Sequence, residues 1–111
     1  MNMARFAFPA LVFVAAFAAG QVAAADIEAG KKKAQEICAS CHNMDGVSTI
    51  ADYPKLAGQY PDYMAKALRD YKSGLRKNPI MAGMAAGLTP KDIDDVSAYF
   101  SSLPPVVSTR M

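Results

Sequence analysis

Two cysteines and a histidine lie close together in the first half of the chain. Cys38, Cys41 and His42 belong to the pentapeptide CASCH, and the 111 residues contain no other cysteine or histidine. Two cysteines three residues apart at a helix end lie on one side of it. Each thiol could form a thioether with one vinyl group of a haem, and the histidine could then bind the iron. The spacing therefore predicts a covalently attached c-type haem.

The same residues could serve other chemistry. An oxidising compartment permits a disulfide or a thioredoxin-like redox pair between Cys38 and Cys41. Neither uses His42, and the strand-helix pattern that a redox pair requires is missing from the sequence. A structural zinc site needs four ligands, more than the cysteines and the histidine provide. Haem attachment is the interpretation that uses all three side chains.

A second axial ligand is expected on the opposite face of the iron, and methionine is the common choice when no second histidine exists. Five methionines follow the motif: Met44, Met64, Met81, Met84 and Met111. Met44 is too close to His42 to reach the opposite face of the haem. Met64 falls in an apolar helix stripe, and Met111 ends the chain. Met81 and Met84 remain, in a segment with proline and glycine that we expect to be a loop. Spacing alone does not choose between them.

Helical periodicity dominates the part of the chain that carries these residues, and no stretch alternates as a strand. Three helices are expected, over residues 27–39, 61–74 and 90–103. Asp26 is a candidate N-cap for the first, Gly74 is a C-cap for the second, and Thr89 with Asp92 caps the third. Gly30 lies on the buried face of the first helix, which suggests the close approach of another helix. The predicted fold class is all-α.

Residues 1–25 differ in composition from the rest. They contain one charge, Arg5, followed by an apolar stretch over residues 6–19 and by three alanines ending at Ala25. This pattern predicts a secretory signal peptide, cleaved after Ala25. An uncleaved membrane anchor is the alternative, because the apolar part is just long enough to span a bilayer. Its proline, glycine, glutamine and many alanines make a poor span.

The remaining residues, 26–111, are expected to form one small domain exported to the periplasm. The chain has 12 Lys and Arg against 10 Asp and Glu, and this near balance excludes a typical nucleic-acid binder. Its size excludes an enzyme with a strand-helix nucleotide-binding domain beside a second domain.

The domain resembles the class I c-type cytochromes, most closely short bacterial monohaem cytochromes similar to one half of the dihaem cytochromes c. The resemblance covers almost all of residues 26–103. Its motifs are Gly30 eight residues before Cys38, CASCH at 38–42, PKLAGQ at 54–59, GLRKNPIMAGM at 74–84 and LTPKDIDDVSAYF at 88–100. It implies a small cytochrome c fold, with three main helices and loops wrapped around one covalently attached haem c.

The resemblance also implies roles for individual residues. Gly30 should pack against an aromatic residue of the last helix, Tyr99. The backbone carbonyl of Pro54 should accept the ring N–H of His42, which orients the ring and strengthens it as a ligand. The first methionine of the MxxM pattern, Met81, is the expected iron ligand.

Neither the motifs nor the resemblance identifies the residues that hold the haem propionates. The chain lacks tryptophan, which longer mitochondrial relatives use near a propionate. Tyr71, Arg76 and Lys77 are candidates to take its place.

The expected function is that of a periplasmic one-electron carrier with His42 and Met81 as axial ligands of the haem iron. No titratable group beside the motif could serve as an acid or base, and a six-coordinate iron has no open position for substrate, so no enzymatic activity is expected. A cytochrome subunit of a larger periplasmic dehydrogenase complex is the first alternative. A ligand-binding or peroxidase-like haem protein is the second.

Redox proteins are the expected partners, as electron donors and acceptors, and nucleic acid is not. The chain is expected to be a monomer that could contact membrane redox complexes peripherally. Lysines such as Lys31, Lys32 and Lys33 could form a positive rim that attracts an acidic partner. A solvated helix face is the simpler interpretation of these residues.

Overall fold

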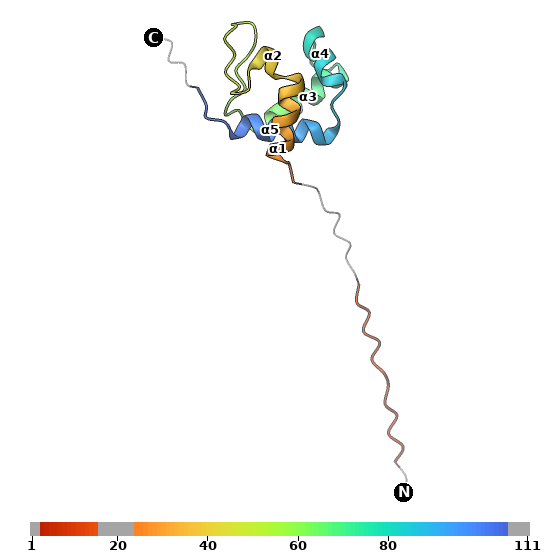
Figure 1. Ribbon diagram of the computed structural model, residues 1–111. Coiled ribbons are helices and arrows are strands. Elements are labelled where there is room, and N and C mark those ends of the chain that lie inside the picture. Colours follow the sequence, from red (N-terminus) through yellow and green to blue (C-terminus); the bar gives the residue numbers. More distant parts are fainter. Residues whose placement is uncertain (1–2, 16–23, 107–111) are drawn as a thin grey trace.

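The computed structural model describes residues 3–15 and 24–106. Its helices are α1 (Ile27–Ile37), α2 (Ala39–His42), α3 (Pro61–Ser73), α4 (Pro79–Ala86) and α5 (Pro90–Ser102), and the described residues contain no strand (Figure 1). The predicted all-α class is confirmed.

The apolar N-terminal segment carries no regular structure over residues 3–15, which lie exposed and apart from the helices (Figure 1). No helix in the described part of the chain is long and apolar enough to cross a membrane. Residues 16–23, a few positions before the expected cleavage point, lie outside the described residues. Cleavage after Ala25 therefore stays a prediction.

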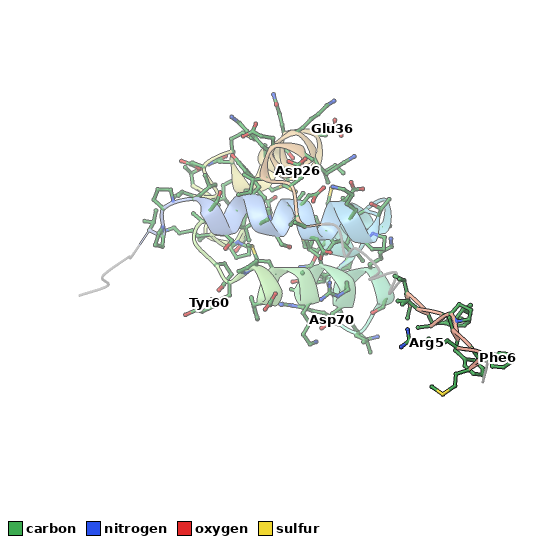
Figure 2. The ribbon with its side chains drawn as sticks, turned by 90° about the horizontal axis from the view of Figure 1, so that it is seen from below. Arg5, Phe6, Asp26, Glu36, Tyr60 and Asp70 are labelled. Carbon is green, nitrogen blue, oxygen red and sulfur yellow. The ribbon has the colours of Figure 1, made fainter. Side chains whose placement is uncertain are left out.

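Helix α5 lies between α1 and α3 (Figure 2) and contributes more buried side chains than any other helix of the described residues. Two apolar clusters form the core. The first contains Ala34, Met64, Tyr99 and Phe100, and the second contains Ala65, Leu88 and Ile93. Because α5 contributes to both clusters, it aligns the helices that carry the candidate site.

The crossing of α1 and α5 depends on Gly30. A Cβ atom at this position would lie 2.0 Å from the backbone oxygen of Asp95 and 3.1 Å from the Cβ of Tyr99. The predicted contact with Tyr99 is confirmed, although the backbone of Asp95 is the nearer neighbour. Only glycine lets the two backbones approach this closely.

Replacing Gly30 by alanine is expected to lower the free energy of unfolding by about 2 kcal/mol, because the new methyl group would force α1 away from α5. Chemical denaturation of the haem protein measures this change. Gly83→Ala is the matched control. That glycine is also helical and has no atom within 4 Å of a built Cβ, so it should gain about 0.5–1 kcal/mol. Equal denaturation midpoints for Gly30→Ala and the native protein would contradict the packing argument.

The predicted helix ends are largely confirmed. The side chain of Asp26 accepts a hydrogen bond from the backbone N–H of Ala29 at 3.0 Å. Gly74 ends α3 in the left-handed conformation, with a φ of 85°. Thr89 and Asp92 form a reciprocal capping box at α5. The backbone N–H of Thr89 lowers the pKa of Asp92, because it donates to the ionised carboxylate.

The expectation of a loop around Met81 is wrong. Residues 79–86 form α4, which begins with Pro79. The side chain of Asn78 accepts hydrogen bonds from the backbone N–H groups of Ile80 and Met81 at 3.0 and 3.1 Å. Proline interrupts a helix in its interior, but at the first helical position it has no hydrogen bond to lose.

Two further details differ from the expectation. The first helix ends at Ile37, and the residues that follow Cys38 form the separate turn α2. Tyr60, four residues before Met64 and so in line with the apolar stripe expected of the second helix, is 78% exposed. It is the N-cap residue with an extended backbone, and therefore lies outside the helical period that places the stripe.

Candidate functional site

A cleft bounded by the end of α1, by α2, α3 and α4 contains the predicted site residues. It consists of two cavities of about 320 and 200 Å³. Both cavities are lined by Cys38, His42, Pro54, Leu68, Tyr71 and Met81. The two cavities are therefore neighbouring parts of one site, and residues from 37 to 88 meet in its larger part.

His42 is held in a defined orientation at the end of α2. Its side chain is buried, with 6% of its surface exposed. The ring Nδ1 lies 2.8 Å from the backbone oxygen of Pro54, so the predicted contact is confirmed. Because a carbonyl oxygen can only accept, Nδ1 carries the proton and Nε2 keeps the lone pair for a metal.

The two cysteines are free thiols at the wall of the same cleft. Burial, and then the neighbouring Cys41, raise the pKa of Cys38 to about 11. A redox-active CxxC pair has a thiol with a lowered pKa, so this environment opposes the thioredoxin-like interpretation. Cys38 lines both cavities and Cys41 lines the larger one, where both thiols could reach one planar group.

The methionines differ in how the structure places them. Met81 is half-buried and lines both cavities, whereas Met84 lines only the larger one and is 43% exposed. Met64 is buried in the core and reaches the smaller cavity, and Met44 packs against the same core cluster. Met111 lies outside the described residues. Met81 is therefore the more enclosed member of the pair that the sequence left open.

Two of the three propionate candidates lie at the cleft. The guanidinium of Arg76 lies 4.9 Å from the centre of the Tyr71 ring and donates a hydrogen bond to the hydroxyl of Tyr63 at 3.4 Å. Arg76 and all of its aromatic neighbours line the smaller cavity. The hydrogen bond with Tyr63 raises the pKa of Arg76 above its usual value. Lys77 lines neither cavity.

A loop that was not predicted from the sequence also borders the larger cavity. Ile50, Asp52 and Tyr53 line it, and the ring of Tyr53 lies 6.3 Å from that of His42. The sequence contains a signal for this loop, because Tyr53 immediately precedes Pro54, whose carbonyl accepts a hydrogen bond from His42.

The lining residues fit a covalently attached haem. Two thiols lie on the wall beside one buried imidazole with a free ring nitrogen, and the thioether of Met81 lines the same space. Most of the other lining side chains are apolar, as the macrocycle requires.

Comparison with known proteins identifies the family. The family model described as cytochrome c matches residues 27–104. The chain belongs to the cytochrome c family. It is 42% identical over 79 residues to cytochrome c4 of Thiocapsa roseopersicina, which covers 71% of this chain and 41% of that relative. The chain thus spans about two fifths of the length of this relative.

Two further similar proteins show the range of sizes. Cytochrome c-554(548) of Halomonas halodenitrificans is 39% identical over 82 residues, covering 71% of this chain and 98% of that protein. A solved thiosulfate dehydrogenase of Marichromatium purpuratum superposes with a TM-score of 0.68 at 35% identity, covering 76% of this chain and 20% of that one. The same cytochrome fold therefore occurs in chains of very different lengths.

Membership of the cytochrome c family confirms the fold and the cofactor that CASCH predicts. The family carries covalently attached haem c with its iron, and the mostly apolar lining of the cleft suits such a group. The resemblance to one half of a dihaem cytochrome is also confirmed, because the match covers less than half of cytochrome c4.

Proposed function

We propose that this protein is a one-electron carrier with His42 and Met81 as axial ligands of a single haem attached through Cys38 and Cys41. The observation that carries the proposal is that all four side chains line one cleft. A bound c-type haem supplies a reversible Fe(III)/Fe(II) couple. If both side chains bind the haem iron, no position would be left for a substrate, so the proposed carrier would have no enzymatic activity.

The chain's own residues set the properties of such a carrier. The backbone oxygen of Pro54 holds the ring of His42 in one tautomer and strengthens it as a donor. The thioether of Met81, as a ligand, would favour the reduced iron and so raise the reduction potential. The apolar lining of the cleft limits water near the iron, which also favours the state of lower charge.

The proposed location is the periplasm, supported by the leader pattern and by the haem motif. Signal cleavage after Ala25 would release the domain that begins at Asp26. Export also places Cys38 and Cys41 where a disulfide could form, so both thiols must be kept reduced until haem is attached. A cytochrome maturation system is therefore required in the host.

Redox proteins are the proposed donors and acceptors, with peripheral contact to membrane redox complexes and a monomeric state. The surface lysines give limited support for an electrostatic docking rim. Lys33 pairs with Glu36 at 3.3 Å, and Lys66 pairs with Asp70. These exposed pairs neutralise part of the positive charge, which favours the solvated-face interpretation.

A cytochrome subunit of a larger dehydrogenase is the second candidate function. The likeness to part of a thiosulfate dehydrogenase favours it. The match to nearly the whole of cytochrome c-554(548) favours the independent carrier, because a chain of this size is then a complete protein in another organism. Both candidates use the same site residues.

Purification of the native protein from the periplasm of its own host tests this choice. A free carrier should elute as a small monomer, titrate reversibly with one electron and, when reduced, fail to bind carbon monoxide at neutral pH. Co-elution with a stoichiometric dehydrogenase polypeptide would establish the subunit role. Ready carbon monoxide binding would overturn the six-coordinate site and the carrier function with it.

A further inference from the structure

A buried carboxylate lies outside the haem site, where α5 crosses α1. Asp95 is only 3% exposed. Its Oδ1 accepts a hydrogen bond from the backbone N–H of Asp26 at 2.8 Å, and its Oδ2 accepts one from the Nζ of Lys91 at 2.6 Å. Figure 2 shows Asp26 beside α5, at the start of α1. The group therefore joins the first residue before α1 to the middle of the last helix.

The buried carboxylate of Asp95 is paired with a cation that is largely exposed. Burial acts to raise the pKa of Asp95, but the hydrogen bonds from Asp26 and Lys91 lower it below its usual value. The carboxylate is thus ionised. Its cation, Lys91, has a side chain that is 59% exposed, and such a partner is screened by water. A buried anion is stabilised far better by a second cation that is itself held in place.

The hydrogen bond to Oδ1 of Asp95 comes from the backbone N–H of Asp26. Signal cleavage would convert this amide nitrogen to an amine. Hydrolysis of the Ala25–Asp26 peptide bond consumes one water, whose hydroxyl goes to the carbonyl carbon of Ala25 and one of whose protons goes to the nitrogen of Asp26. The released amine takes a further proton from solvent at neutral pH. A neutral amide N–H then becomes an ammonium group with three donors, at the position already bonded to Asp95.

We propose that Asp95 is the binding site for the mature N-terminus of this protein, and that removal of the leader locks α1 onto α5 through an ion pair with the new ammonium group. This inference rests on the proposed export and cleavage. It assigns a structural consequence to processing, since the unprocessed chain has only an amide hydrogen bond at this point.

The local geometry favours this lock. Charge-assisted hydrogen bonds are about twice as strong as neutral ones. A positive charge at the start of a helix is opposed by the helix dipole, so the ammonium group needs the carboxylate to offset that repulsion. The side chain of Asp26 caps α1 through the N–H of Ala29, and the glycine at the crossing keeps the backbone of Asp95 close. Cleavage leaves both contacts in place.

The pH dependence follows from the amine. An α-amino group titrates at about 7.7–8.0 in peptides. A partner that binds its charged form adds stability below that range, and the added stability is lost as pH rises above it. The charged groups around the carboxylate are Lys91 and Asp92 on α5 and the side chain of Asp26, with Lys33 of α1 near Asp92. The native protein and the glycine-insertion variant used in the test both contain all of these groups.

The test compares two haem proteins made in a maturation-competent host. One is the native sequence, and the other carries two glycines inserted between Ala25 and Asp26, so that the amine is displaced and Asp26 keeps an amide. Mass spectrometry identifies the first residue of each, and unfolding by urea, which is uncharged and does not screen the ion pair, is measured at pH 6 and pH 9.5. At pH 6 the native protein should have a folded-to-unfolded ratio about tenfold larger. The difference should shrink at pH 9.5.

Asp95→Asn in both backgrounds should remove the difference at pH 6. Equal stability of the two parent proteins at pH 6, or a difference that persists with asparagine, would overturn the inference. If the asparagine variants do not fold, the pH dependence of the parent pair decides alone. A native protein that starts at another residue also overturns it. The redox titration and spectrum of the same sample are independent of the N-terminus, so failure of the carrier function is recognised separately.

Discussion

Replacing Met81 by alanine is expected to abolish the weak near-infrared absorption band that methionine ligation gives ferric haem. The reduction potential should fall by on the order of 100 mV, since axial ligands tune haem over about 0.8 V and methionine raises the potential. The physical reason is the loss of the thioether that favours reduced iron. Optical spectra of both oxidation states and a potentiometric titration measure the two effects.

Met84→Ala is the matched control, because the two methionines share α4 and the larger cavity. Met84 is 43% exposed and does not reach the smaller cavity, so its removal should leave the band in place. If the band survives in Met81→Ala and disappears in Met84→Ala, the proposed ligand is wrong although the carrier function stands. Loss of the band in neither variant would exclude both methionines.

The double variant Cys38→Ala with Cys41→Ala is expected to lack covalent haem and to leave the domain largely disordered. The larger cavity alone measures about 320 Å³. At about 24 cal/mol per Å³ of cavity, leaving it empty would cost up to ~8 kcal/mol, which is comparable to the total stability of a small domain, about 5–15 kcal/mol. Circular dichroism and the dispersion of amide proton resonances measure the loss of structure.

Ser40→Ala is the control for that variant. Ser40 lies exposed between the two cysteines, and its replacement keeps their spacing and the following histidine. This protein should attach haem and fold normally. A cooperative unfolding transition with native-like spectra in the cysteine double variant would show that the helices pack without the cofactor.

Haem attachment could be predicted from the sequence because its signal is local. Cys38, Cys41 and His42 lie within one pentapeptide, so no knowledge of the rest of the fold is needed to bring them together. The capping box at Thr89 and the C-cap at Gly74 were predictable for the same reason, since each acts on residues within one helical turn. The prediction of a loop after Asn78 was wrong because proline can occupy the first position of a helix as well as interrupt its interior.

The remaining features depend on contacts between residues distant in the chain. Whether Met81 or Met84 is the more enclosed is decided by how α4 packs against α3, and spacing carries no information about that. Tyr63 meets Arg76 only because α3 is followed by a chain reversal. The contact of Asp26 with Asp95 joins residues 69 positions apart.

The sequence thus determined the cofactor chemistry and the all-α class, which follow from short-range spacing and periodicity. Tertiary packing decided which side chains enclose the cleft and which nitrogen meets the buried carboxylate. The physical reason is that packing depends on the summed shape and burial of whole helices. A glycine at a crossing or a half-buried methionine acquires its role only when α1, α4 and α5 take their places.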